Sequence, residues 1–563
     1  MVEEQALAPA VARGVDIASL AALSAAVAAC GGGGGDAAPT PPAPPPPPPA
    51  PPPPPPVSAV QASRFLAQAS MGATKAEIAR VQSIGYAAWL DEQFALPQQG
   101  TRWDWLVSKG FNADTNKNGE AGFDSSAWRK LIAAPDTLRQ RVTLALSELI
   151  VTAIDGLVGG GGWKAFSAAA WLDMLEANAF GNYRTLLQDV SRSTAMGLFL
   201  TFRGNVKADA AKGTLPDENY AREVMQLFTI GLQKLNADGS PQLSGGQTQD
   251  TYGQDDIGGL ARVFTGWDFD LAGGTTATPD YHRRPMIQVA SRHESGAKVF
   301  LGTTIPAGTD GAASLGLALD ALFAHPNIAP FVSRQLIQRL VSSNPSPAYV
   351  ARVAAVFAND GSSTRGSLRA VLKAILLDDE ARTVSTAPGG GKLREPMLRF
   401  LAWARAFNAT SATDAWALGN TTDPGTRLGQ SPLRSPSVFN FFRPGYVPPN
   451  SAIATAGLVA PEFQITNESS VVGYLNYMQR AVSTGFGDVL ADYTGLLALA
   501  DNAQALFDEL NLVLAAGQIG ATNLATIKAA LDSVASGTDT ARRNRVQAAL
   551  VLVLAAPEFL VLK

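Results

Sequence analysis

Cysteine and histidine are scarce in this chain. Its 563 residues include one cysteine and three histidines. Structural zinc sites, redox CxxC pairs and disulfide frameworks are therefore excluded by count. Charge is also scarce, because 16% of the residues are charged and the formal net charge is −4. Without a basic excess the chain lacks the electrostatic footprint of nucleic-acid binding, and we expect no nucleic-acid partner.

Signatures of several enzyme families are also missing. The sequence has no GxSxG nucleophile elbow, no GxxxxGK[ST] phosphate loop and no GxGxxG that opens a helix after a strand. This disfavours serine hydrolases, P-loop enzymes and dinucleotide-binding enzymes. An enzyme that works with paired carboxylates has no such spacing signature, so that class stays open.

The N-terminus resembles an export signal that ends at the single cysteine. Residues 17–29 form an uncharged apolar run, too short to span a bilayer, which needs about 20 apolar residues. The run ends in the letters VAAC, which resemble the lipobox of bacterial lipoproteins. We therefore predict that Cys30 is lipidated and tethers the protein to the cell envelope. By resemblance to lipoprotein sorting, Gly31 at the next position favours the outer membrane.

The charge of the first residues does not fit this prediction. A signal peptide typically starts with positive charge, whereas this start carries Glu3, Glu4 and Asp16 against Arg13. An ordinary thiol in an unstructured tail is therefore the alternative for Cys30.

A glycine- and proline-rich stretch follows the cysteine. Residues 39–56 hold 15 of the 37 prolines. Proline repeats adopt an extended helix that rises about 3.1 Å per residue, so this tract can hold a domain on the order of 50 Å from a membrane. We predict a signal peptide over residues 1–29, the lipidated cysteine with a disordered spacer over residues 30–58, and a helical domain over residues 59–563.

Helix signals dominate the predicted domain. Thr74 and Glu77 have the spacing of a capping box, and Gly85 is placed to end that helix. Ser367 can cap a helix whose apolar residues recur with the 3.6-residue period of one buried face. Helices are predicted further along the chain over residues 138–151, 166–175, 349–357 and 542–554.

Strand signals are few. Residues 286–289 and 298–301 have the composition of two short strands, and we predict that they pair as a hairpin. The predicted fold class is mainly α, a large multi-helix domain in two or more packed lobes with a small β-hairpin.

Several longer motifs occur along the domain. The most specific are ENYAREVMQLFTIGL over residues 218–232 and DDIGGLARVFTGW over residues 255–267. The others are RFLAQASMGAT (64–74), LRQRVTLALSELIV (138–151), FGNYRTLLQDVSRSTAM (180–196), KVFLG (298–302), KLREPMLRF (392–400), QSPLRSPSVFNFFRPGYVP (430–448) and APEFQITN (460–467). Together they resemble the bacterial domain-of-unknown-function 1800 family over nearly the whole chain after the proline tract.

The resemblance implies a compartment and a partner but no reaction. Members of this family are usually exported, and their genes often lie beside one for an exported alkaline-phosphatase-like or sulfatase-like protein. The resemblance therefore implies an exported lipoprotein with such a protein as its partner. The family has no established activity, so the chemistry stays open. Many members carry histidine where this chain has Phe228, so a metal role for that position would fail here.

The ENYARE segment supplies the candidate catalytic residues. Glu218 and Arg222 have the i,i+4 spacing of an ion pair, and Asn219 and Glu223 lie along one flank of the buried helix face. A carboxylate there is costly unless it is paired, so Glu223 should have a partner. Either these four side chains line a polar cleft with Glu223 as general base, or Glu223 belongs to an internal network, for instance through Arg262. We favour the network.

Candidate binding residues lie in and after the ARVFTGW segment. They are Asp256, Arg262, Trp267 and His293. A tryptophan beside charged groups can form a stacking wall for a sugar or a cation, but it is more often a core residue whose indole N–H donates to a carbonyl. A metal site that combines His282 with His293 is a further possibility, although a lone histidine more often bridges backbone groups.

One loop has part of a calcium signature. Asp114, Asn116 and Asn118 stand at positions 1, 3 and 5 of a calcium loop, with glycine at position 6 and Glu120 after it. The bidentate glutamate expected at position 12 is replaced by Ser125. These four oxygen-bearing residues are our candidates for a structural calcium site, and an Asn/Gly-rich turn is the alternative.

Two functions are compatible with these features. The first is a surface-tethered binding or assembly factor for another exported protein or an envelope polymer, which fits the anchor, the spacer and the missing enzyme signatures. The second is an extracytoplasmic carboxylate-dependent hydrolase with a cleft around residues 218–223. It requires that the ENYARE side chains meet Asp256 or His293 in one concave pocket. We favour the first.

Overall fold

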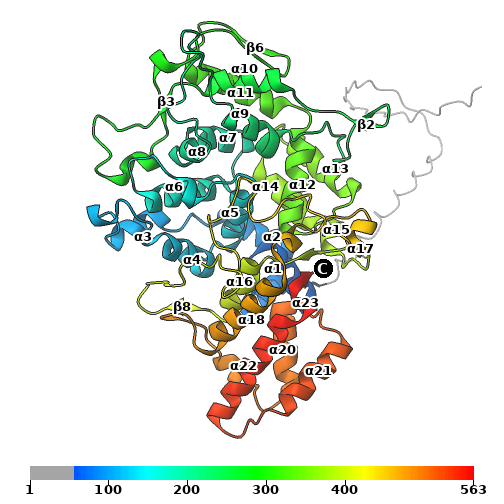
Figure 1. Ribbon diagram of the computed structural model, residues 1–563. Coiled ribbons are helices and arrows are strands. Elements are labelled where there is room, and N and C mark those ends of the chain that lie inside the picture. The colour runs from blue at the N-terminus through cyan, green and yellow to red at the C-terminus, as the bar shows by residue number, and fades with distance from the viewer. Residues whose placement is uncertain (1–55, 388) are drawn as a thin grey trace, which may run out of the picture. The chain divides into compact units, whose positions relative to one another are not determined.

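Helices make up most of the structure over residues 56–387 and 389–563, which the computed structural model describes (Figure 1). The predicted signal peptide, Cys30 and most of the predicted spacer lie outside the described residues. The described chain contains 23 α-helices, and its strands form only two-stranded antiparallel sheets. The prediction of a mainly α fold is confirmed.

The first group of helices is arranged around α5, which contacts α1, α2, α4 and α6. Nearly every residue of α5 is buried, so its charged side chains lie inside the protein. The helices of this group are α1 (Ala59–Ala69), α2 (Lys75–Ala95), α3 (Arg102–Ser108), α4 (Phe123–Ala133), α5 (Thr137–Leu149), α6 (Lys164–Asn178), α7 (Tyr183–Arg192) and α8 (Thr194–Phe199).

The middle group begins with the ENYARE segment and includes a π-helix, η3. Its first helices pack against the small sheets, and α12 returns to contact α5. The helices of this group are α9 (Asn219–Glu223), η3 (Val224–Thr229), α10 (Gln254–Ala261), α11 (Gly311–Ala324), α12 (Ile328–Leu340), α13 (Pro347–Ala358), α14 (Leu368–Leu377) and α15 (Asp379–Arg382).

In the last group, α20, α21 and α22 lie at one end of the ribbon, where α18 and α20 pack against α22 and α21 packs against α20 (orange and red in Figure 1). Its helices are α16 (Pro396–Ala406), α17 (Ala452–Thr455), α18 (Glu468–Ser483), α19 (Thr494–Leu497), α20 (Ala503–Ala515), α21 (Ala521–Asp532), α22 (Asp539–Ala555) and α23 (Pro557–Leu560).

The five strand pairs are short and join loops to one another. The last of them brings the C-terminal residues back to the KLREP segment. The pairs are β1 (Leu243–Ser244) with β2 (Gln247–Thr248), β3 (Trp267–Asp268) with β4 (Ile287–Gln288), β5 (Lys298–Phe300) with β6 (Thr303–Ile305), β7 (Lys392–Leu393) with β10 (Val561–Leu562), and β8 (Thr410–Ser411) with β9 (Val489–Leu490).

The predicted pairing of residues 286–289 with residues 298–301 is wrong. Strand β4 pairs with β3, and β5 pairs with β6 across a two-residue turn. That turn consists of Leu301 and Gly302, whose φ angles are +49° and +72°. Two positive φ angles suit a tight hairpin turn, whose twist matches that of the strands. Strand β5 therefore pairs with β6, to which this turn connects it, and not with the more distant β4.

The local helix signals hold in the structure. Thr74 and Glu77 form both hydrogen bonds of the capping box, and Gly85 breaks the helical geometry inside α2 with a φ of +80°. The Ser367 side chain caps α14, and the apolar side chains of its periodic face are buried. No single helix in the described ranges is long and apolar enough to cross a membrane, and α11 and α12 meet the test only as a pair bent by 76°.

Candidate functional site

The ENYARE segment continues into a π-helix, where we predicted a regular α-helix. The wider turn is held by side chains, because the Thr229 hydroxyl donates to the Val224 carbonyl at 2.6 Å and the Tyr183 hydroxyl donates to the Phe228 carbonyl at 2.7 Å. Gly231 follows with a φ of +70°. Because π-turns often occur at functional sites, the geometry of this segment is compatible with a functional role.

Two of the four candidate catalytic side chains, Glu218 and Asn219, join neighbouring elements, and Arg222 pairs with Glu218. The predicted ion pair is present, with Glu218 Oε2 3.2 Å from an Arg222 nitrogen. Glu218 also accepts two hydrogen bonds from the Gln254 amide, at 2.8 and 3.0 Å, which link α9 to α10. The Asn219 amide donates to the Thr201 hydroxyl at 3.4 Å. These contacts are those of a structural junction.

Glu223 differs from its neighbours because its carboxylate is buried without a partner. Its residue exposure is 8%, and its Oε2 atom has no hydrogen-bond partner among the described residues. Burial raises the pKa of Glu223, and the nearby Arg222 opposes that rise. The predicted contact with Arg262 is not formed, because that guanidinium donates to the Ala297 carbonyl at 3.3 Å, beside β5.

Three of the four candidate binding residues form hydrogen bonds with the backbone, whereas the Trp267 indole nitrogen has no partner among the described residues. Asp256 accepts from the Gly253 and Leu301 amides at 2.8 and 2.6 Å, so it caps α10 and holds the β5–β6 turn. Trp267 is buried in β3. His293 is buried too, and its Nδ1 donates to the Thr265 carbonyl at 3.0 Å. Neither this set nor residues 218–223 line any of five cavities found among the described residues.

The two histidines considered for a metal are each engaged with backbone. His282 Nε2 donates to the Gly162 carbonyl at 3.1 Å, and burial lowers the pKa of His282 to about 4. Burial also lowers the pKa of His293. Over residues 56–387 and 389–563, no three His, Cys, Asp or Glu side chains are grouped closely enough to hold a metal ion.

The candidate calcium loop begins as a short 3₁₀ turn, Asp114–Asn116. Its Glu120 carboxylate is directed to two cations, with Arg434 at 3.0 Å and Lys164 at 3.7 Å. Arg434 also forms a two-pronged pair with Asp124, with both distances 2.9 Å. Glu120 is therefore paired with cations of the protein itself. Because Arg434 belongs to residues 430–448, this pair joins the loop to that segment.

A cleft that the sequence did not indicate lies between α3, α6, the end of α7 and the turn η5 (Pro279–Arg283). Its volume is about 450 Å³. We call it the arginine cleft. Its polar and aromatic lining includes Trp103, Asp104, Asp189, Arg192, Arg283 and Arg284.

Of the three arginines in the arginine cleft, only Arg283 is paired with a carboxylate among the described residues. Arg283 pairs with Asp280 at 2.8 Å and lies over the Trp103 ring, 5.1 Å from its centroid. Arg284 donates only to the carbonyl of Asp270, at 3.0 Å. In the described part of the chain, neither Arg192 nor Arg284 has an acidic side chain within ion-pair distance. Both can therefore donate hydrogen bonds to a carboxylate or another oxyanion of a ligand.

The cleft also has acceptors of its own. Asp189 accepts from the Asn178 amide at 2.9 Å, and Asp104 is exposed at the rim. Asp189 and Arg192 belong to the FGNYRTLLQDVSRSTAM motif, but Arg283 and Arg284 come from a loop about ninety residues later in the chain. Their spacing in the sequence therefore does not predict that these residues meet. The adjacent pair Arg283 and Arg284 was the one sequence feature that could have indicated the cleft.

A second polar feature, the buried charge network, lies around α5. Lys392 pairs with Glu462 at 3.0 Å, and Arg339 pairs with Glu148 at 3.3 Å. Lys392 and Arg141 both donate to the Arg339 carbonyl, at 2.8 and 2.5 Å. All five side chains are at most 5% exposed. The network also includes Gln430, whose amide donates to Glu395 at 2.6 Å. Four of the sequence motifs named above contribute residues to it.

Glu148 and Glu395 are buried next to each other inside this network. Burial and the neighbouring carboxylate raise the pKa of Glu148 well above its usual range. The pKa of Glu395 is lowered, against the effect of its burial, because Glu148 donates a hydrogen bond to it and Lys392 and Arg141 lie close. The two pKa values are therefore driven apart, which favours the proton on Glu148 over Glu395.

A protein-family model described as "Protein of unknown function (DUF1800)" matches residues 64–561. The chain belongs to this family. The DUF1800 match runs from α1 to β10 and contains both the arginine cleft and the buried charge network. No significant match was found among curated proteins or among solved structures. The family description assigns no activity, so the function must be argued from the geometry.

Proposed function

We propose that this protein is an exported, membrane-tethered binding or assembly factor, and that its DUF1800 domain holds a segment of another exported protein in the arginine cleft. The observation that carries the proposal is the cleft itself. Its volume of about 450 Å³ suits a few side chains of a partner, because ligand pockets commonly measure about 300–1,000 Å³.

The charges of the cleft favour a polypeptide segment over a uniformly charged polymer. Arg192 and Arg284 can bind carboxylate groups, while Asp104 and Asp189 can accept hydrogen bonds from amide or ammonium groups. Trp103, over which Arg283 lies, adds an apolar wall. A protein partner offers both signs of charge and apolar surface together. An envelope polymer is the alternative ligand that the experiment below distinguishes.

The proposed location rests on the N-terminal sequence. Lipidation of Cys30 would anchor the protein, the following glycine favours the outer membrane, and the proline-rich spacer would hold the domain away from the lipid surface. The family resemblance suggests an exported alkaline-phosphatase-like or sulfatase-like protein as the partner. The same resemblance supports a bacterial origin.

A carboxylate-dependent hydrolase is a second candidate, and Glu223 is the observation that favours it. A buried carboxyl with a raised pKa and no partner for Oε2 is suited to proton transfer. Against it, Glu218 and Asn219 are engaged in structural contacts. Asp256 and His293 also support backbone.

The binding proposal is tested by capture from solubilised envelopes. The anchored full-length protein should retain a specific exported protein. The double variant Arg192→Ala/Arg284→Ala should retain at least tenfold less of that partner. Arg352→Ala is the matched control, because Arg352 is an exposed arginine paired with Asp378, outside the cleft. Equal capture by the double variant would contradict the cleft assignment. Retention of a polysaccharide or peptidoglycan fragment in place of a protein would identify the alternative ligand.

A further inference from the structure

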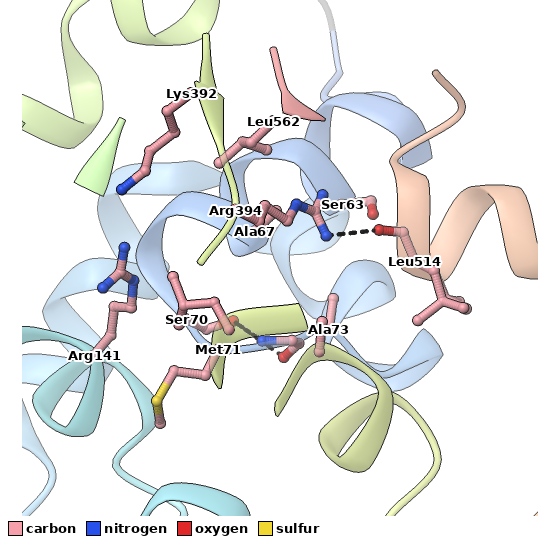
Figure 2. A pocket seen from close by; sticks show the side chains of 14 residues that line it. Ser63, Ala67, Ser70, Met71, Ala73, Arg141, Lys392, Arg394, Leu514 and Leu562 are labelled. Atoms are coloured by element: carbon pink, nitrogen blue, oxygen red, sulfur yellow. Dashed lines mark hydrogen bonds between the residues drawn. The ribbon is translucent and has the colours of Figure 1, made fainter. Parts of the chain in front are cut away.

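A small cavity lies inside the protein, next to the buried charge network. It is bordered by α1 and the turn after it, by the β7 segment and by the end of α20 (Figure 2). Its volume is about 20 Å³, enough for one water-sized occupant. Three basic side chains line it, namely Arg141, Lys392 and Arg394. Figure 2 shows Arg141 and Lys392 together on one side and Arg394 on the other.

The arginines at this cavity have more hydrogen-bond donors than the protein satisfies. Arg141 is 1% exposed and Arg394 is 5% exposed. Arg394 Nη1 donates to the Leu514 carbonyl at 3.0 Å, and Arg141 Nη2 donates to the Arg339 carbonyl. Among the described residues, Nε and Nη1 of Arg141 and Nε and Nη2 of Arg394 have no acceptor. Leaving charged donors buried and unsatisfied is costly, so they call for an acceptor in the cavity.

The charge balance around the cavity indicates which acceptor fits. The network and its immediate neighbours contain more basic than acidic residues, all of them buried. Burial also raises the pKa of Glu148, which favours its neutral form and acts in the same direction. The basic members are Arg141, Arg339, Lys392, Arg394 and Arg399, and the acidic members are Glu148, Glu395 and Glu462.

We propose that this cavity binds a small monovalent inorganic anion of the size of chloride, held by Arg141, Lys392 and Arg394. Water could accept some of the hydrogen bonds, but it is neutral and leaves the excess positive charge uncompensated. Phosphate and sulfate are too large for a space of about 20 Å³. The site is separate from the arginine cleft and does not depend on the proposed function.

The anion has a structural consequence. The cavity lies where α1, α5, β7 and α20 meet, and these elements belong to the beginning, the middle and the end of the domain. An anion shared by Arg141 and Arg394 would therefore hold together segments far apart in the sequence. We expect the folded domain to be stabilised by the anion through mass action, because the unfolded chain has no such site.

The test compares the thermal unfolding of the full-length protein in sodium chloride, sodium bromide and sodium isethionate at equal ionic strength. Isethionate is too large for the cavity. Chloride and bromide should raise the unfolding midpoint in a saturable way, by about 2 °C or more. The variant Arg141→Met should lose this response, and the control Arg352→Met, which alters an exposed guanidinium, should keep it.

A second measurement covers the case in which Arg141→Met does not fold. Crystals of the unaltered protein grown in bromide should show an anomalous scattering peak between Arg141 and Arg394. The same unfolding midpoint in all three salts would overturn the proposal, as would crystals in which the cavity holds only water.

Discussion

Glu223 is buried on α9, and no cation among the described residues lies within ion-pair distance of its carboxylate. A buried carboxylate led us to expect an ion-pair partner, yet its Oε2 atom has none among the described residues. The pair between Glu218 and Arg222 was predictable because i,i+4 spacing is local. The environment of Glu223 was not, because it depends on where Arg262, on another element, directs its side chain.

The raised pKa of Glu223 makes the stability of the protein pH-dependent. Because burial raises this pKa above its ordinary 4.5, the folded protein holds the proton more tightly than the unfolded chain does. As the pH rises through 4.5, the unfolded chain ionises first and the free energy of unfolding falls. The decrease ends once the pH exceeds the pKa of the folded state.

The variant Glu223→Gln should therefore stabilise the protein at neutral pH. We expect a gain of about 1 kcal/mol at pH 7 and no gain below pH of about 4, where the native side chain is itself neutral. Denaturant unfolding at several pH values measures both. Glu218→Gln is the matched control and should bring no gain at neutral pH, because its carboxylate is half-exposed and paired. A loss of stability in Glu223→Gln at pH 7 would contradict this account.

At the scale of elements, local signals were reliable and pairing between distant segments was not. The capping side chains of Thr74 and Ser367 and the kink at Gly85 follow from a few adjacent residues, and the structure confirms them. The pairing of β5 was mispredicted because the two-residue turn at Leu301 and Gly302 offered a shorter connection. The π-helix after Glu223 was also missed, because the periodic pattern of its side chains resembles that of an α-helix.

The contact between α10 and β5 depends on a glycine. A side-chain carbon at Gly259 would lie 1.8 Å from the Val299 carbonyl oxygen, whereas at Gly258 the nearest atom would be 3.6 Å away. Gly259→Ala should therefore destabilise the protein by about 1–3 kcal/mol through overpacking. Gly258→Ala should be neutral or stabilising by up to about 1 kcal/mol, because alanine favours the helix. Unfolding in denaturant compares them, and equal effects would show that α10 does not pack against β5 in this way.

At the scale of the whole molecule, the motifs that identify the family are distributed along the sequence but meet in space. Arg141 and Glu148 on α5 belong to one buried charge network with residues 392–395, 430 and 462. The family membership was predictable because it needs only the motifs themselves. The arginine cleft was not, because about ninety residues separate Arg192 from Arg284 and the sequence does not define the path of the chain between them.

The proposed tether gives a prediction about location. Replacing Cys30 with serine removes the only thiol that a lipid can modify. The variant should leave the membrane fraction, whereas the unaltered protein should stay there and resist a thiol-reactive maleimide. Fractionation and labelling together measure this. An unaltered protein that is soluble and reacts with maleimide would indicate the alternative, an ordinary thiol in an unstructured tail.

The central claim is that the arginine cleft holds a protein partner, and site-specific photo-crosslinking in living cells tests it most directly. A benzophenone amino acid in place of the exposed Asp104, at the rim of the cleft, should yield one discrete crosslinked product that contains another exported protein. The same group in place of Asp539, a fully exposed residue on α22, should yield none. Crosslinking at Asp539 equal to that at Asp104, or none at either position, would contradict the claim.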